Sequence, residues 1–189
     1  MTAETMISIF LGIGLAASVG FRVFLPLFVL SLAAYFQVWD LNDQWEWIGS
    51  VPALITLGVA TVVEIFAYFI PYVDNLLDSI ALPLAALAGT AVMVATVSEL
   101  DPVITWSLAI IAGGGTAAAI KGASATGRLT STATTAGVGN PIISLIETAT
   151  ALLMSVVSVI APVIASILVI LLLIFIFTIY RKLRPRLSK

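Results

Sequence analysis

The chain has 189 residues, of which 61% are hydrophobic and only 10% are charged, and its formal net charge is −2. Soluble domains average about 45–50% apolar and about 25% charged residues, so this chain has too few polar side chains to cover a water-exposed surface. It has no cysteine and no histidine, which excludes disulfides, thiol chemistry and metal or haem sites built on these ligands. The composition predicts an integral membrane protein without a cofactor.

The first apolar segment, residues 5–36, is longer than an ordinary membrane helix of roughly 17–25 residues. It contains Gly20-Phe21-Arg22 and then Pro26, and a glycine and a charge inside an apolar run predict a broken helix or a tight hairpin. The N-terminus carries Glu4 and lacks the basic region of a signal peptide. We therefore expect this segment to be retained in the membrane.

The remaining chain alternates between apolar segments and polar or proline-marked connectors. Three tryptophans and three acids between residues 39 and 47 are typical of the bilayer interface. The predicted spans are residues 22–36, 48–70, 80–97, 103–120, 142–158 and 162–180, with a seventh at 5–20. The predicted fold class is therefore all-α, a polytopic transmembrane helix bundle of about six to seven spans, in a single membrane domain over residues 1–189.

Two connectors leave alternatives open. Residues 71–78 predict a polar connector or a short interfacial helix. Residues 121–141 are rich in alanine, glycine, serine and threonine, which permits close helix approach and can satisfy exposed backbone groups. This second segment predicts either a re-entrant element that lines a pathway or a flexible cytoplasmic loop.

Charged residues near the span ends predict the orientation, because lysine and arginine concentrate on the cytoplasmic side. Five of the eight cations lie in the last nine residues, which predicts a cytoplasmic C-terminus and places the acidic connectors at 40–46 and 98–101 outside. These tail cations are Arg181, Lys182, Arg184, Arg186 and Lys189. The side of the N-terminus depends on the structure of residues 5–36 and stays open.

The two halves of the chain resemble each other. Residues 17–22 are similar to residues 123–128, and each is followed by a proline-marked apolar segment and a helix with a lone glutamate. In the predicted topology these two helices run in opposite directions, as the inverted repeats of secondary transporters require. The repeat halves would be residues 5–97 and 103–180. A composition biased toward alanine and glycine gives similar matches by chance, and that alternative stays open.

Three segments carry a family resemblance: Gly20-Phe21-Arg22-Val23-Phe24-Leu25-Pro26-Leu27, then Glu64 with Pro71-Tyr72-Val73-Asp74 and Asp78, and the Gly/Ser/Thr segment before Asn140-Pro141. Over nearly its whole length the chain resembles a bacterial integral-membrane family known as domain of unknown function 4126. The resemblance implies a bacterial inner (cytoplasmic) membrane location and a single polytopic domain. It implies no activity, so a function must be argued from the residues.

Ionisable residues within the spans are the first functional candidates, because a charge at the bilayer centre costs at least about 2.5–3.5 kcal/mol on insertion scales. Glu64 and Glu147 each lie about 9 Å from the end of a predicted span at 1.5 Å per residue. They predict ion ligands, proton carriers or counter-charges for a substrate. The alternative is that they pair with Arg22, Lys121 or Arg128 and fix helix packing.

The cations of the repeat segments are candidates for substrate binding. The arginine fork suits carboxylate or phosphate, and backbone N–H groups at the ends of broken helices favour anions. The alternative for these cations is an anchor at the cytoplasmic face. The predicted binding set is Arg22, Lys121, Arg128 and Asn140.

Two aspartates complete the predicted site. Asp74 and Asp78 are spaced i, i+4 and would share one helix face. They predict a pair that binds a cation or a proton, because like charges raise one of the two pKa values. The alternative is a solvated connector.

These residues favour a small inner-membrane transporter for an anionic or zwitterionic solute or lipid headgroup, coupled to protons or sodium through the carboxylates. The alternatives are an ion channel or a structural or assembly subunit that transports nothing. An enzyme is not predicted, because no nucleophile–base pair is visible. The predicted partners are the lipid bilayer, a second copy of the chain in a homodimer, and an unidentified small-molecule or lipid substrate; no metal and no nucleic acid are predicted.

Overall fold

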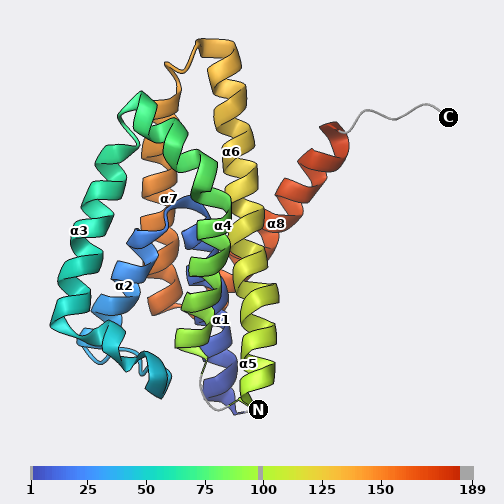
Figure 1. Ribbon diagram of the computed structural model, residues 1–189. Helices are drawn as coiled ribbons and strands as arrows, with labels where there is room; N and C mark the ends of the chain where they lie inside the picture. The colour runs from blue at the N-terminus through green and yellow to red at the C-terminus, as the bar shows by residue number, and fades with distance from the viewer. Residues whose placement is uncertain (1, 98–99, 184–189) are drawn as a thin grey trace.

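The computed structural model describes residues 2–97 and 100–183. All regular secondary structure in these residues is helical (Figure 1). The elements are α1 (Ala3–Phe21), α2 (Phe24–Tyr35), the 3₁₀ helix η1 (Asp43–Gly49), α3 (Val51–Ala67), α4 (Pro71–Thr96), α5 (Pro102–Leu108), the π-helical turn η2 (Ala109–Gly114), α6 (Gly115–Thr135), α7 (Asn140–Ile160) and α8 (Pro162–Leu183). The all-α fold class is confirmed.

The bundle has the helices and the surface of a multi-pass membrane protein. In the described part of the chain, five helical stretches are long and apolar enough to cross a bilayer, or up to six if η1 and α3, which are bent by 65°, count as one span. These five are Ala3–Phe21, Leu76–Thr96, Pro102–Thr135, Asn140–Ile160 and Pro162–Lys182. Large apolar side chains cover the outside, among them the exposed Ile174, Phe175 and Phe177 of α8. Lipid is the solvent that suits such a surface.

α1 is the central helix, and it packs against α4, α6, α7 and α8. Leu11, Leu15 and Val19 on this helix are buried in the main hydrophobic core. Gly14 and Gly20 have no room for a side chain, because an added Cβ would lie within 3 Å of Ser158 or Ile120. Such close approach is the usual way in which helices pack in a bilayer.

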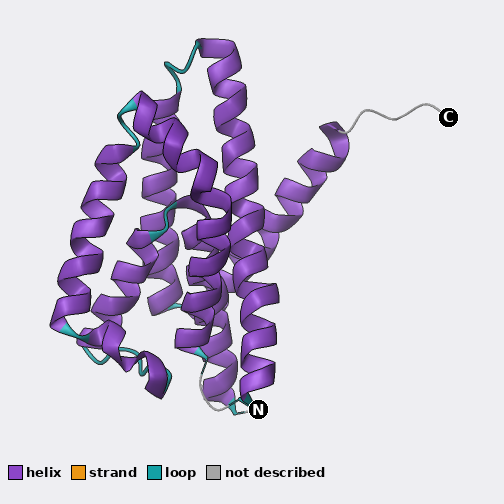
Figure 2. Ribbon diagram, viewed as in Figure 1, coloured by secondary structure: helices purple, strands orange, loops and turns teal. Residues whose placement is uncertain are grey.

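The chain reverses between α1 and α2, in the middle of the bundle. α2 runs back toward the end where α1 begins (Figure 1), and the short loop between them lies inside the bundle (Figure 2). Arg22 has an extended backbone at this break, with φ −140° and ψ 130°. At 1.5 Å per residue α2 is about 18 Å long, short of the roughly 30 Å hydrocarbon core. The predicted hairpin is therefore found, whereas the predicted span at 22–36 is too short to cross.

The predicted connector at residues 71–78 is the beginning of α4. The helix starts at Pro71, whose fixed φ suits the first helical position, and it continues without a break to Thr96. The prediction of a solvated connector is therefore wrong. The two aspartates of this segment do share a helix face, as their spacing predicted.

The segment 121–141 is neither a re-entrant element nor a loop. α5, η2 and α6 form one helical stretch from Pro102 to Thr135, and only residues 136–139 form a turn before α7. Threonine side chains of α6 donate hydrogen bonds to carbonyl groups four residues earlier, as Thr126 does to Gly122. These bonds satisfy the hydroxyls within the helix, so the polar composition did not require an irregular backbone.

Other predictions on the topology have mixed outcomes. The break at Pro162 between the last two helices is confirmed. η1 and the start of α5 lie at one end of the bundle, and α8 ends toward the other (Figure 1), as the placement of the acidic connectors required. Glu99 of the second connector lies outside the described residues. So do the tail cations Arg184, Arg186 and Lys189.

Replacing Gly113 with alanine is expected to destabilise the bundle at the contact between η2 and α4. An added Cβ at Gly113 would lie 2.5 Å from the carbonyl oxygen of Gly89 and 2.7 Å from the Cβ of Met93. Overpacking of this kind costs about 1–3 kcal/mol. The free energy of unfolding, measured by SDS titration in mixed micelles, checks this.

Gly115 is the matched control, because an added Cβ there would meet nothing within 4 Å. Gly115→Ala is expected to keep or raise stability, since alanine is about 1 kcal/mol better than glycine in a helix. Equal effects of the two substitutions would contradict the close contact.

Candidate functional site

Seven of the eight sequence-predicted site residues lie in one cluster beside the break between α1 and α2. Six of them are less than a tenth exposed, and Asp78 is partly exposed. With Tyr68 at their centre they form what we call the charge network. Its members are Arg22, Glu64, Tyr68, Asp74, Asp78, Lys121, Arg128 and Glu147.

Arg128 on α6 is the most heavily bonded cation of the network. Its Nε and Nη2 atoms donate to the two carboxylate oxygens of Glu147 on α7, and its Nη1 donates to Asp74 on α4. Ser124, one turn before Arg128, also donates to Glu147. The two-pronged arginine–carboxylate contact with Glu147 is the strong geometry for such a pair. Together with the contact to Asp74 it joins α4, α6 and α7 at Arg128.

Arg22 lies at the end of α1 and is wholly buried. Its Nη2 donates to the carbonyl oxygen of Ser144 at 2.9 Å and to the Ser144 hydroxyl, and its Nε donates to Thr148 at 2.9 Å. Its Nη1 lies 3.6 Å from Glu147 Oε2 and has no hydrogen-bond partner. Arg22 is therefore held inside the bundle, and its Nη1 atom makes no hydrogen bond.

The ring of Tyr68 lies among the three cations. The guanidinium carbons of Arg22 and Arg128 are 4.1 Å and 4.6 Å from the ring centroid, and Lys121 Nζ is 5.2 Å from it. These are cation–π distances. Lys121 also donates to the Tyr68 hydroxyl at 3.2 Å and lies 3.6 Å from Asp78. Burial raises the pKa of the Tyr68 phenol, so it is a neutral hydroxyl at ordinary pH.

Glu64 caps the short helix α2. Its two carboxylate oxygens accept hydrogen bonds from the backbone N–H groups of Val23 at 2.8 Å and Phe24 at 3.0 Å. The first N–H groups of a helix have no partner within the helix, and its N-terminus favours negative charge. Glu64 therefore holds the break between α1 and α2 in place from a neighbouring helix.

Glu64→Gln is expected to lower the free energy of unfolding by about 1.5–3 kcal/mol, the usual contribution of hydrogen bonds to a charged group. Glutamine keeps one acceptor oxygen but loses the second acceptor and the charge. SDS unfolding in mixed micelles measures this, with Glu46→Gln as the control because Glu46 is exposed on η1. Equal stability of the two variants would show that the cap contributes nothing.

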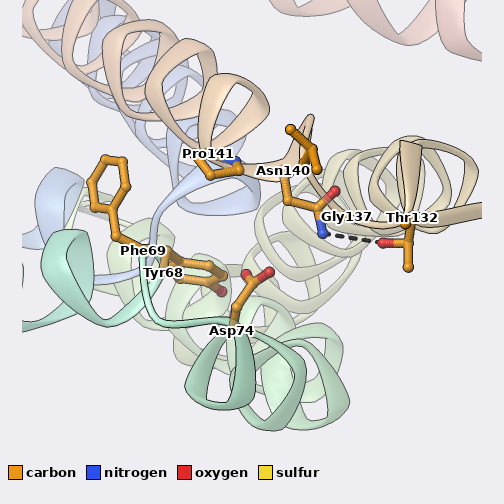
Figure 3. Close-up of a pocket in the computed structure, with 9 residues that line it drawn as sticks. Tyr68, Phe69, Asp74, Thr132, Gly137, Asn140 and Pro141 are labelled. Atoms are coloured by element: carbon orange, nitrogen blue, oxygen red, sulfur yellow. Dashed lines mark hydrogen bonds between the residues drawn. The ribbon is translucent and has the colours of Figure 1, made fainter. Parts of the chain in front are cut away.

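A pocket of about 430 Å³ adjoins the network, and we call it the polar pocket. Tyr68 and Asp74 line one side, and Thr132 and Asn140 line another (Figure 3). The Asn140 amide donates to Thr132 at 3.1 Å. Asn140, the eighth predicted site residue, thus lies in the wall of the pocket, whereas Arg128 is bonded to Asp74 and does not line the pocket. No group of acids that could hold a metal ion is found in the described residues.

The sequence interpretation did not single out Tyr68, Ser144 or Thr148. Tyr68 lies four residues after Glu64 and Ser144 lies three residues before Glu147, both at helical spacing, whereas Thr148 directly follows Glu147. Residues three or four apart share a helix face. Reading the polar residues of each helix by face could have placed both beside the charges.

The comparisons with known proteins identify the family alone. No match to the chain was found among curated proteins or among solved structures. The model of one protein family matches residues 9–182, and it is described as "Domain of unknown function (DUF4126)". The match covers nearly the whole bundle and every residue of the charge network, so the chain belongs to this family.

Proposed function

We propose that the protein is a membrane transporter that carries an anion together with a proton, through the charge network and the polar pocket. The observation that carries this proposal is the contact between Asp74 and Arg128. Asp74 is both a wall of the pocket and a partner of Arg128. An anion in the pocket can therefore bind Arg128 only if Asp74 releases it.

The charge balance of the network explains why a proton would accompany the anion. The network contains three cations and four carboxylates, so its net charge is −1 when all are ionised. Adding an unpaired buried charge is costly. A proton on Asp74 removes one negative charge and frees Arg128, and a monoanion then restores the original balance. Anion and proton are each bound more readily when the other is present.

The position of Asp74 favours proton uptake. Asp74 precedes the candidate span of α4, which begins at Leu76, and it lies in the wall of an open pocket. Burial raises the pKa of the Asp74 carboxyl, although the nearby Arg128 opposes this. A raised pKa means that the proton is taken up at a less acidic pH. Asp74 is thus the coupling residue in this proposal, and Glu147 keeps both arginines in position.

The same proposal includes the location of the protein, its orientation, its oligomeric state and its internal symmetry. We place the protein in a bacterial inner membrane, with the C-terminus cytoplasmic and as a homodimer. An inverted repeat is supported by the opposite directions of α3 and α7 (Figure 1), each with a buried glutamate. The two halves differ in one respect: Arg22 lies at a helix break, whereas Arg128 lies within the continuous α6.

Proteoliposomes that contain a pH-sensitive dye test the proposal. An inward gradient of a transported anion is expected to acidify the lumen, because each anion brings a proton. The panel contains inorganic anions, short carboxylates, phosphate esters and long-chain carboxylates. Glu147→Gln is expected to abolish the acidification, and the control Glu46→Gln to keep it. Absence of acidification with every anion would overturn the proposal.

A structural role for the network is the second candidate, because all three cations already have carboxylate partners. The two roles differ in their readout. If the charges serve packing alone, substitutions lower stability and no anion gradient moves protons in the wild-type protein.

A further inference from the structure

A second pocket, of about 440 Å³, also adjoins the network, at Glu64 and Tyr68, and we call it the apolar pocket. It separates one face of α3 from one face of α4. The α3 face repeats at helical spacing through Val59, Ala60, Val63 and Ala67, and the α4 face likewise through Leu77, Ile80, Ala81 and Leu84. Faces of this kind normally pack against each other. Here α3 packs mainly against α2 and η1, and the space between α3 and α4 is left open.

The apolar pocket has the length of a lipid chain. Its α3 lining extends from Thr56 to Tyr68, which is about 18 Å at 1.5 Å per residue. Half of the roughly 30 Å hydrocarbon core is about 15 Å, the depth of one leaflet. Val59 and Val63 on this lining are more than half exposed, so the pocket is accessible from the surrounding bilayer.

The two pockets meet at the charged end of this lining. Tyr68 lines both of them, and the three cations surround its ring. Glu64 is the one carboxylate of the apolar pocket, and both of its oxygens accept from the N-terminus of α2. A molecule that enters from the bilayer would therefore meet apolar side chains along its length and cations at one end.

We propose that the transported anion is the headgroup of a lipid, with one aliphatic chain in the apolar pocket and a carboxylate or phosphate near Tyr68 and Arg128. This inference rests on the proposed anion transport and names its substrate class. The lipid enters laterally between α3 and α4, and its headgroup replaces Asp74 at Arg128 when Asp74 takes up a proton. The buried, unused Nη1 donor of Arg22 is a second contact for the headgroup.

Photolabelling tests this assignment. The reconstituted protein is mixed with a long-chain fatty acid that carries a diazirine at the chain end, or with the matching long-chain alcohol, and labelled peptides are sequenced. The fatty acid is expected to label the apolar lining of α3 and α4 in the wild type. Arg22→Gln is expected to weaken labelling by the acid and to leave labelling by the alcohol unchanged.

Val63 and Val62 offer a matched pair of variants. They are neighbours on α3 with similar exposure, 59% and 54%, but only Val63 lines the apolar pocket. Val63→Trp is expected to fill the pocket and to abolish labelling by the fatty acid, whereas Val62→Trp keeps it. Both side chains are exposed, so neither tryptophan needs to disrupt the core.

The outcomes separate the lipid site from the transport proposal. Labelling of the lining that Val63→Trp abolishes and Val62→Trp keeps supports the lipid site, even if no anion gradient moves protons, in which case transport alone fails. Proton-coupled movement of a short soluble anion that Val63→Trp leaves unchanged, with no labelling of the lining, overturns the lipid assignment and leaves transport standing. Equal labelling by acid and alcohol in both the wild type and Arg22→Gln overturns the headgroup contact.

Discussion

Arg128→Gln is expected to reduce proton-coupled anion transport strongly and to lower the free energy of unfolding by about 3–5 kcal/mol, the usual cost of breaking a buried ion pair. Arg128 is the partner of both Glu147 and Asp74, so glutamine would leave Asp74 without its cation and Glu147 with only the 3.6 Å contact to Arg22. Loss of a buried charged partner costs at least about 2 kcal/mol of binding. Because 1.4 kcal/mol is tenfold in affinity, transport is expected to fall by about 30-fold or more.

Arg181→Gln is the matched control, because Arg181 is exposed near the end of α8 and its loss should change neither quantity. A double variant tests the ion pair between Arg128 and Glu147 itself. The double variant Glu147→Gln, Arg128→Gln is expected to lose less free energy of unfolding than the two single variants lose together. The reason is that directly bonded residues are coupled by about 0.5–3 kcal/mol. Additive effects on unfolding would contradict the ion pair between α6 and α7.

Asp74→Asn is expected to uncouple anion uptake from the proton. In the wild type, uptake should rise as the pH falls, because only protonated Asp74 releases Arg128. Asparagine is neutral at every pH, so Arg128 stays accessible and uptake at high pH should reach the level that the wild type shows at low pH. The measurement is the initial rate of anion uptake into proteoliposomes across a pH series.

Asp40→Asn serves as the control for this substitution, because Asp40 is exposed before η1. It should keep the wild-type pH dependence. A pH profile of Asp74→Asn that parallels the wild type would assign the coupling proton to another group. Glu147 would be the next candidate, because it is the other carboxylate that contacts Arg128.

Seven of the eight candidate residues lie together in the charge network, whereas the backbone around several of them differs from the prediction. A chain with so few charges makes each one conspicuous, and burial in a bilayer requires that ionisable groups pair or face the interior. That requirement brought Glu64 and Glu147 onto the candidate list, with Arg22, Lys121 and Arg128 as their possible partners. Asp74 and Asp78 were candidates because of their i, i+4 spacing. It does not say which cation pairs with which acid, because the partners lie on different helices.

Local structure was harder to predict where composition resembled that of a loop. Residues 121–135 are mostly small and polar, yet they continue a helix in which their hydroxyls are satisfied by backbone carbonyls of the same helix. The residues around Asp74 are typical of a solvated connector, and they do not indicate that Asp74 is buried. Its burial depends on Arg128, which is 54 residues away in the sequence. The role of Glu64 as a cap also depends on a distant segment, the start of α2. Contacts of this kind leave no periodic signal in the sequence.

The ratio of protons to anions that cross together tests the central claim most directly. Both fluxes can be followed in the same proteoliposomes, with the membrane potential set by a potassium gradient and valinomycin. Movement of one proton together with one monoanion in the same direction carries no net charge, so the proposal predicts one proton for each anion and a rate that does not depend on the potential. An anion flux that carries current without proton movement would contradict coupled transport and would identify the protein as a channel.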